Sequence, residues 1–240
     1  MRIAIVSDIH GNLTALEAVI VDLRKISPDQ ILHGGDLAHG GSSPELVVDR
    51  IRELGWPGVL GNTDEMLFAP EKLTQFAAQS AASYQPLFAA IREIAAATQT
   101  MLSEDRLAWL RELPSTRTFE TFALVHAKPR DLWRAPSPEA GDEEIESAYR
   151  PLGRTRAVYA HIHRSFVRRT TAMTIANTGS VSLSYDGDPR ASYLVLDDED
   201  VFVRRVEYDV AKEVEQLCSS GLPHAEWIAR SLKNATFEMP

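Results

Sequence analysis

The amino-acid sequence predicts an α/β fold, in which short buried strands alternate along the chain with amphipathic helices. Residues 2–7 form an almost uninterrupted apolar run, which is typical of a strand covered on both faces. Apolar residues then recur at helical spacing from Leu16 to Leu23, and Asn12 is placed to cap the first turn of this helix. Residues 30–33 begin the same succession of strand and helix. This alternation is the pattern of an α/β domain.

The next elements continue this alternation. Ser43 is placed to cap a helix whose first residue is Pro44, a position where proline is favoured. Residues 58–60 have the composition of a third short strand. A further helix is expected after Ser103, and it should stop before Pro114.

Residues 65–100 differ in kind from the segments around them. They are rich in Ala and Gln, and we interpret them as one or two inserted helices that are broken at Pro86. Because the insertion directly follows one of the candidate site loops described below, it is a candidate lid. The alternative is a packing helix that covers one face of a sheet.

The second half of the chain has more β character. An acidic helix is expected around residues 142–149, and two amphipathic helices are expected within residues 209–234. No linker or internal repeat is visible, so residues 1–240 are interpreted as a single domain. Short apolar runs that turn residues separate predict strands at 122–125, 157–160, 166–169, 173–176, 193–196 and 201–206.

Composition excludes several classes of protein. The formal net charge of -9 argues against a general nucleic-acid or anionic-membrane surface, though not against an anionic substrate beside bound cations. The longest uncharged stretch, residues 73–91, is too polar to span a membrane. The single cysteine, Cys218, excludes an intramolecular disulfide, and the N-terminal residues form a core strand, so no cleavable signal is expected. We therefore expect a cytoplasmic protein.

Side chains that commonly bind metals follow five of the predicted strands. In open α/β sheets, ligands bind just outside the carboxyl ends of the strands. Asp8 and His10 lie two residues apart, so an extended backbone places both side chains on one side. The candidate ligands are Asp8, His10, Asp36, Asn62, His126, His161 and His163.

Each of these residues taken alone has a simpler interpretation. Asp8 can be a capping residue beside a surface histidine, and Asp36 can accept hydrogen bonds within a glycine-rich loop. Asn62 can occupy a turn position with positive φ, and Asp64 can simply cap the helix that follows it. A histidine at a strand end is often a structural residue. The coincidence of five strand ends is what favours a metal site.

The number and type of these side chains favour two metal ions. Seven ligands are too many for one closed site, and none of them is a thiolate, as structural zinc sites usually require. Paired metals clamp the attacking and leaving oxygens of a displacement, typically at phosphorus, which indicates phosphoester hydrolysis. Mixed carboxylate and imidazole ligands suit Mn, Fe, Zn, Co or Ni, and the order of affinities alone does not select one.

The motifs and their order resemble those of calcineurin-like metallophosphoesterases, usually written D-x-H, G-D, G-N-H-D, H-G and G-H-x-H. Residues 177–181 and 188–193 look like the compact prokaryotic phosphodiesterase branch, so the resemblance covers about residues 1–206. It implies a four-layer α/β/β/α sandwich with two mixed β-sheets flanked by helices. The matching segments are Asp8-Ile9-His10, Gly35-Asp36, Gly61-Asn62-Thr63-Asp64, His126 and Ala160-His161-Ile162-His163.

The resemblance also implies a role for each ligand. The first metal would be bound by Asp8, His10 and His163. The second metal would be bound by Asn62, His126 and His161. Asp36 would bridge the two ions, and a hydroxide between them would be the nucleophile.

The sequence departs from the family pattern where many members have a histidine that protonates the leaving oxygen. Thr63 occupies that position, and its hydroxyl does not titrate near neutral pH. Compact members often lack this histidine, so its absence does not exclude an enzyme. His39, on the glycine-rich loop after Asp36, is the first candidate for another acid, and Asp64 is a second catalytic candidate. Ala127 and Ala160 replace motif glycines, which we expect only to tighten the backbone.

Two further residues are expected near the substrate. The resemblance places the loop after His126 beside the cleft, where Arg130 would pair with a phosphate oxygen and Trp133 would lie close by. The alternative for Arg130 is a surface ion pair. Asn12 matches a position near the first turn and can be purely a helix cap.

The leading functional interpretation is a two-metal phosphodiesterase that acts on a small phosphoester or nucleotide. An alternative in the same class is a nucleotide-polyphosphate or phosphoprotein phosphatase. An alternative of another class is a non-catalytic scaffold that keeps the fold and binds partners. Retention of all seven ligand positions speaks against the scaffold. The sequence carries no signal for an oligomeric state.

Overall fold

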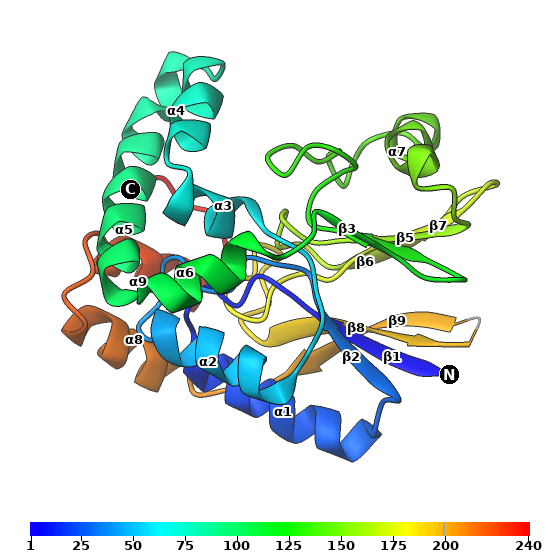
Figure 1. Cartoon of the computed structure of the whole chain (residues 1–240), viewed down its shortest axis with the longest axis horizontal. Helices are drawn as coiled ribbons and strands as arrows, with labels where there is room; N and C mark the ends of the chain where they lie inside the picture. The colour runs from blue at the N-terminus through cyan, green and yellow to red at the C-terminus, as the bar shows by residue number, and fades with distance from the viewer. Residues whose placement is uncertain (199) are drawn as a thin grey trace.

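The fold consists of two mixed β-sheets that face each other with helices on their outer sides (Figure 1). The structure is a computed structural model that describes residues 1–198 and 200–240. One sheet has the order β2-β1-β8-β9, and the other has the order β3-β4-β5-β7-β6. Each sheet combines parallel and antiparallel pairs: β1 runs parallel to β2 and antiparallel to β8, while β4 runs parallel to β5 and antiparallel to β3. The predicted α/β sandwich is confirmed.

The first sheet comprises β1 (Arg2–Val6), β2 (Gln30–His33), β8 (Ala191–Asp197) and β9 (Asp200–Val206). The second comprises β3 (Thr116–Thr118), β4 (Ala123–Val125), β5 (Arg156–Tyr159), β6 (Phe166–Arg169) and β7 (Thr174–Asn177). The longer helices outside the insertion are α1 (Leu13–Ile26), α2 (Pro44–Leu54), α6 (Glu104–Arg111), α7 (Asp142–Tyr149), α8 (Val210–Ser219) and α9 (Ala225–Asn234).

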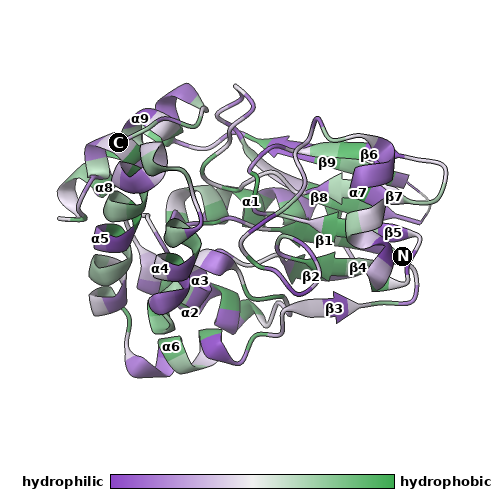
Figure 2. Cartoon of the chain, turned by 90° about the horizontal axis from the view of Figure 1, so that it is seen from above, coloured by the Kyte–Doolittle hydropathy of each residue, from purple (hydrophilic) through white to green (hydrophobic). Residues whose placement is uncertain are grey.

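Alternate residues of β1 enter two different cores, which explains why this strand is apolar on both faces. Ile3 and Ile5 pack with residues of the second sheet, including Leu124. Ala4 and Val6 belong to the core that the first sheet forms with α1 and its neighbours. Figure 2 shows that β1 and β2 are largely hydrophobic, as expected for strands buried on both faces. The outer helices, by comparison, carry both hydrophobic and hydrophilic residues. Burial on both faces fixes β1 in register and therefore fixes the loop that follows it.

Several predicted boundaries need correction. Residues 58–60 do not form a strand of either sheet, because only an isolated bridge joins Gly58 to His33 of β2. The short edge strand β3 was not predicted, since Thr-Arg-Thr carries no apolar alternation. Ser43 precedes α2 as expected but makes no capping hydrogen bond with its side chain, whereas Ser103 does cap α6.

The inserted segment contains more helices than predicted, and its breaks lie elsewhere. The first helix begins at Asn62, one of the candidate ligands, and not at Glu65. Pro86 starts the longest helix and does not break it, because a proline in the first turn has no hydrogen bond to lose. The elements are α3 (Asn62–Phe68), α4 (Glu71–Ala78), the 3₁₀ turn η1 (Ala82–Tyr84) and α5 (Gln85–Met101).

The insertion and the C-terminal helices gather at one end of the molecule, beyond the carboxyl ends of the central strands (Figure 1). Within the described ranges, none of the helices combines the length and apolarity that a bilayer crossing requires. The insertion packs against the core that α1 shares with the first sheet, which both Leu73 and Phe88 join.

A buried ionic contact joins α1 to the far strands of its own sheet. The Asp22 carboxylate accepts two hydrogen bonds from the Arg204 guanidinium, at 2.9 and 3.0 Å, and one from the Tyr193 hydroxyl at 2.8 Å. Burial acts to raise the pKa of Asp22, but the Arg204 guanidinium outweighs it and lowers that pKa. Asp22 therefore favours the folded state most strongly above its ordinary pKa, and this contribution fades as the pH falls below it.

We predict that Asp22→Ala lowers the free energy of unfolding by about 2 kcal/mol at pH 7, because it leaves a buried hydroxyl and a guanidinium without their shared partner. Chemical denaturation monitored by circular dichroism measures this change. Asp105→Ala is the matched control, since it removes an ion pair to Arg52 whose aspartate side chain is 74% exposed. A loss below about 0.5 kcal/mol for Asp22→Ala, equal to the control, contradicts the assigned role.

Candidate metal centre

Loops at the carboxyl ends of β1, β2, β4 and β5, together with the start of α3, bring the candidate ligands together. The loops after β1 and β2 are tied by backbone hydrogen bonds, with the amides of Asp8 and His10 donating to the carbonyls of Gly35 and Asp36 at 3.0 Å. Five candidate ligands have positive φ, a conformation that costs energy for residues other than glycine and that the surrounding structure must enforce. They are Asp8, His10, Asp36, His161 and His163, with φ between 48° and 70°.

One group of buried side chains surrounds a single point. Donor atoms of Asp8, His10, Asp36 and His163 all lie within 4.8 Å of one another. His10 Nε2 is 3.2 Å from His163 Nε2, and His163 Nε2 is 3.2 Å from Asp8 Oδ1. These are the residues expected at the first metal together with the expected bridging carboxylate.

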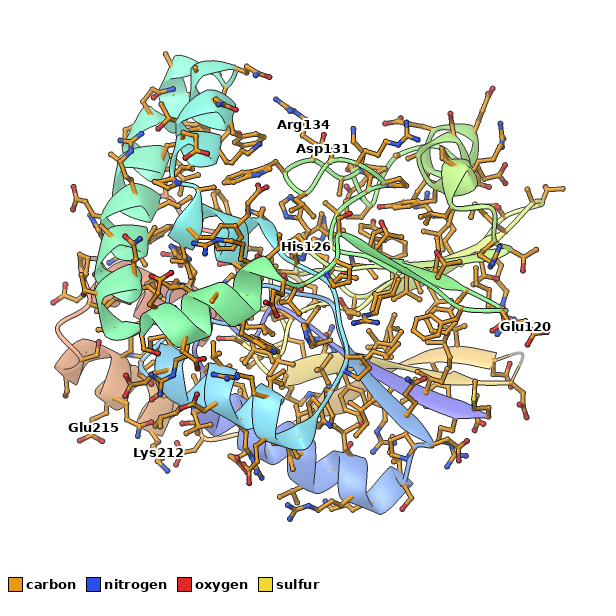
Figure 3. All side chains as sticks on the ribbon, viewed as in Figure 1. Glu120, His126, Asp131, Arg134, Lys212 and Glu215 are labelled. Atoms are coloured by element: carbon orange, nitrogen blue, oxygen red, sulfur yellow. The ribbon has the colours of Figure 1, made fainter. Side chains whose placement is uncertain are left out.

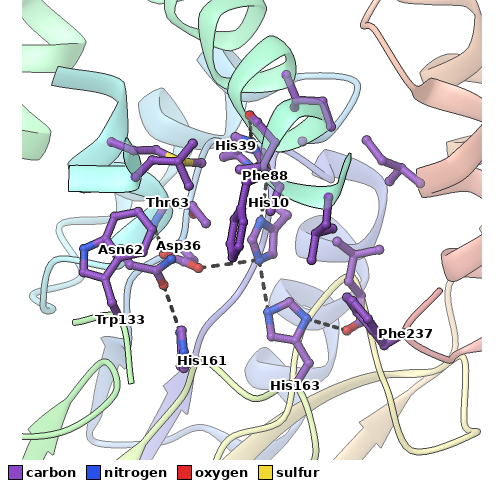
Figure 4. A pocket seen from close by; sticks show the side chains of 18 of the residues that line it. His10, Asp36, His39, Asn62, Thr63, Phe88, Trp133, His161, His163 and Phe237 are labelled. Carbon is purple, nitrogen blue, oxygen red and sulfur yellow. Dashed lines mark hydrogen bonds and ion pairs between the residues drawn. The ribbon is translucent and has the colours of Figure 1, made fainter. Parts of the chain in front are cut away.

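A second group surrounds the side-chain oxygen of Asn62. His126 Nε2 and His161 Nδ1 both lie 2.9 Å from Asn62 Oδ1. His126 Nε2 is also 3.5 Å from Asp36 Oδ1, while the other oxygen of Asp36 faces His10 Nε2 at 3.7 Å. The two oxygens of Asp36 therefore face one group each. Figure 4 shows Asp36 beside His10 of the first group.

Three of the imidazoles are held in one orientation by the backbone. Their Nδ1 atoms lie against carbonyl oxygens: His10 against His39 at 2.8 Å, His126 against Gly34 at 2.8 Å, and His163 against Leu183 at 2.7 Å. A carbonyl oxygen only accepts, so the proton of each neutral ring is on Nδ1 and the Nε2 lone pair faces inward. Histidines that bind metals typically have such a partner behind the ring.

Burial favours uncharged rings here, whereas facing imidazoles keep the carboxylates charged against the effect of burial. Burial lowers the pKa of His10, and it lowers the pKa of His161 to about 4 with a further contribution from His126. Burial acts to raise the pKa of Asp8, but the facing imidazole of His163 lowers it to about 2. Burial also acts to lower the pKa of His163, but the facing Asp8 carboxylate outweighs it and raises that pKa, so His163 is the ring that holds a proton most strongly. The carboxylates and the rings of His10 and His161 present the deprotonated forms that bind metals.

The residues fit divalent cations. His10 Nε2 and His163 Nε2 meet at 3.2 Å, and His126 Nε2 meets Asn62 Oδ1 at 2.9 Å. Hydrogen-bond acceptors that face each other in a buried site are stabilised by a shared electrophile such as a metal ion, and buried carboxylates are stabilised by positive charge. Imidazole with carboxylate is a donor set for transition metals more than for Ca²⁺.

Asp64 supports the site from behind. Its buried carboxylate accepts hydrogen bonds from the amides of Leu37 at 2.9 Å, Ala38 at 3.4 Å and Gly61 at 3.4 Å. Burial and the nearby charge of Asp36 raise the pKa of Asp64 to about 7. Asp64 is not among the residues that line the cavity. It does not precede the helix as the predicted cap would, but lies in the first turn of α3, where its carboxylate accepts from the amide of the N-cap residue Gly61 and joins the Asp36 loop to the start of this helix.

Thr63 and His39 both line the cavity in front of the two groups. The Thr63 amide donates to Asp36 Oδ1 at 2.9 Å, and its buried hydroxyl has no hydrogen-bond partner among the described residues. Burial, with a contribution from His10, lowers the pKa of His39 to about 4, so His39 is uncharged at neutral pH. Such a ring has no readily lost proton, which weakens His39 as a general acid.

The loop after His126 presents a different residue from the one expected. Arg130 is exposed and is not among the cavity-lining residues, whereas Trp133 lines the cavity and donates its indole N–H to Glu65 at 2.7 Å. Arg130 thus lies outside the cavity in which the sequence places a phosphate. Figure 3 shows His126 at the inner end of β4 and Arg134 at the outer end of this loop.

Two other positions have definite surroundings. Asn12 is a helix cap, because its Oδ1 accepts from the amide of Ala15 at 2.8 Å and its Nδ2 donates to Ser182 at 3.1 Å. Sequence reasoning missed Tyr185, whose ring stacks on His163 with centroids 4.7 Å apart. Tyr185 lies in a segment rich in turn residues, and nothing in the local sequence predicts that its ring stacks on His163.

Comparisons with known proteins agree with this geometry. An uncharacterized protein of Methanocaldococcus jannaschii is 28% identical over 96% of both chains. A protein of Synechococcus described as a probable cyclic nucleotide phosphodiesterase is 26% identical over 70% of this chain and 71% of its own.

Solved structures share the whole architecture. The crystal structure of a metallophosphoesterase from Sphaerobacter thermophilus superposes with a TM-score of 0.79 at 27% identity, covering 98% of this chain and 99% of its own. A hypothetical protein from Pyrococcus horikoshii superposes with a TM-score of 0.84 at 16% identity, over 99% of both chains, which shows the common fold.

The family assignment follows from the match to a family model and from the site itself. The model described as the calcineurin-like phosphoesterase superfamily domain matches residues 1–200, which include every residue of the two ligand groups. The chain belongs to the calcineurin-like phosphoesterase superfamily and is a phosphoesterase.

Proposed function

We propose that this protein hydrolyses phosphodiesters with two divalent metal ions. The observation that carries the proposal is Asp36, a buried carboxylate whose two oxygens face two separate groups of donor atoms. Asp8, His10 and His163 complete the first group. Asn62, His126 and His161 complete the second.

Bound divalent cations would supply Lewis acidity, lower the pKa of a water molecule and stabilise charge on the phosphoryl oxygens. The protein's own contribution is to hold the donor atoms in place. Backbone carbonyls behind His10, His126 and His163 orient these rings, and the Thr63 amide steadies Asp36. Because these contacts exist before a substrate binds, the site needs little reorganisation during the reaction.

The lining of the cavity supports a diester over a monoester. A diester carries one negative charge fewer, and within the described residues the cavity is lined by no lysine or arginine that would neutralise it. The Synechococcus relative, described as a probable cyclic nucleotide phosphodiesterase, agrees with this choice.

We further propose a cytoplasmic location, in keeping with a single exposed cysteine that is free. We also propose manganese as the metal, because the mixed carboxylate and imidazole donor set accepts it.

Asp36→Asn should remove bound metal and activity while leaving the fold intact, because the amide keeps the volume but loses the charge that both groups share. We expect less than one equivalent of tightly bound metal and a fall in kcat/KM of at least about 10²-fold. Elemental analysis and hydrolysis of bis(p-nitrophenyl) phosphate measure the two effects. Asp105→Asn, at an exposed ion pair, is the control. Two equivalents of metal with unchanged turnover in Asp36→Asn would falsify the bridging role.

Thr63 at the acid position predicts a steep dependence of kcat/KM on the pKa of the leaving group. A series of aryl phosphodiesters with graded phenol pKa measures this dependence. General acid help is worth about 10²–10⁴-fold, so Thr63→His should raise kcat/KM at least about tenfold on the poorest leaving groups and little on nitrophenol.

If kcat/KM of the wild-type protein does not depend on the pKa of the leaving group, another residue already donates the proton. His39→Ala then tests the first candidate donor, because His39 lines the cavity whereas Asp64, the second candidate, does not. If kcat/KM of the wild-type protein depends steeply on the pKa of the leaving group and Thr63→His does not change this dependence, position 63 is not the position of the acid.

A further inference from the structure

The cavity in front of the metal centre has a polar floor and apolar walls. Its volume is about 350 Å³, within the size range of small-molecule sites. The floor consists of candidate metal ligands, together with Thr63 and His39. The walls come from four parts of the chain: helices α3 to α5 of the insertion, the loop after His126, the segment between β7 and β8, and the C-terminal segment from α9 onward.

Aromatic rings form two continuous rows along these walls. In the first, Trp133 lies 5.3 Å from Phe76, and Phe76 lies 5.7 Å from Phe88 between ring centroids. In the second, Tyr185 stacks on the metal-site residue His163, and Phe237 meets Tyr185 edge to face at 5.7 Å. Figure 4 shows Trp133 and Phe237 on either side of the ligand groups, with Phe88 between them. Both rows therefore begin at or beside the reaction centre and lead away from it.

Charged groups are scarce in the same walls. Among the cavity-lining residues that the structure describes, Asp36 is the only carboxylate, and neither lysine nor arginine occurs. Arg134 lies behind the first row, with its guanidinium 4.9 Å from the centre of the Phe76 ring, and is bonded to Gln79. A second phosphate placed in this cavity would lose its hydration and find no cation, which costs several kcal/mol for a buried charge.

We infer that the substrates are phosphoesters with an apolar organic group, alkyl or aryl, which binds between the two aromatic rows while the phosphoryl group faces the ligand cluster. This inference rests on the proposed phosphodiesterase function and deepens it. Phe237, Phe88 and Trp133 are the specificity-determining residues. Nucleotide polyphosphates are excluded by the same walls, because their additional charges would be buried without partners.

Binding of alkylphosphonates tests this inference without turnover. These compounds carry the anion and a chain of chosen length but no ester bond to hydrolyse. Calorimetry on the manganese-loaded protein should give a dissociation constant for hexylphosphonate at least about tenfold below that for methylphosphonate, since each buried methylene contributes up to about fourfold. Equal dissociation constants for the two compounds overturn the inference.

Two exposed phenylalanines provide a matched pair of variants. Phe237 is 49% exposed at the cavity, and Phe202 is 40% exposed on β9, so neither alanine variant removes a core residue. Phe237→Ala should cut the preference for hexylphosphonate at least about threefold, whereas Phe202→Ala should leave it unchanged. Equal effects of the two variants contradict a specificity role for the C-terminal segment.

Failure of the inference can be told apart from failure of the proposed function. Hydrolysis of bis(p-nitrophenyl) phosphate that depends on manganese, combined with no effect of chain length on phosphonate binding, overturns the inference alone. Absence of metal-dependent hydrolysis for every diester overturns the proposed function instead. As a positive test of selectivity, p-nitrophenyl hexyl phosphate should exceed p-nitrophenyl methyl phosphate in kcat/KM at least about tenfold, with the same leaving group in both.

Discussion

The structure depends on one constraint, which is that electron-pair donors from four strand ends are buried facing each other. Such an arrangement is unfavourable by itself, because inward-facing lone pairs repel and buried carboxylates lose their hydration. It persists because the rings are fixed from behind by backbone carbonyls and because the loops after β1 and β2 are hydrogen-bonded to each other. The positive φ values of five of these residues are a second sign that the surrounding fold enforces the arrangement.

The rest of the fold can be understood as support for these loops. Because β1 is buried on both faces, its register is fixed, and so are the positions of Asp8 and His10 just beyond its end. The second sheet, packed face to face with the first, delivers the histidines that follow β4 and β5 to the same point. Asp64 joins the loop of Asp36 to the start of α3 through backbone amides. The insertion and the C-terminal helices then close the open side with apolar and aromatic walls.

Sequence reasoning predicted those features that obey local rules. An almost uninterrupted apolar run located β1, and ligand type after predicted strands selected all seven members of the two groups, although Asn62 follows no strand and instead begins α3. It failed where tertiary contacts decide. The edge strand β3 has no apolar pattern, and Pro86 begins a helix because the chain has already turned before it. Arg130 has the right chemistry for a phosphate, but its loop carries it outward and turns Trp133 inward, a choice that no local spacing encodes. The aromatic rows combine residues from distant segments and are visible only in three dimensions.

The central claim is that the two groups of donor atoms bind two separate ions that share Asp36. Anomalous diffraction from crystals of the manganese-loaded protein tests it most directly. The account predicts two anomalous peaks, roughly 3.5–4 Å apart, one beside Asp8, His10 and His163 and the other beside Asn62, His126 and His161. A single peak, or two peaks of which neither lies within bonding distance of Asp36, would contradict it.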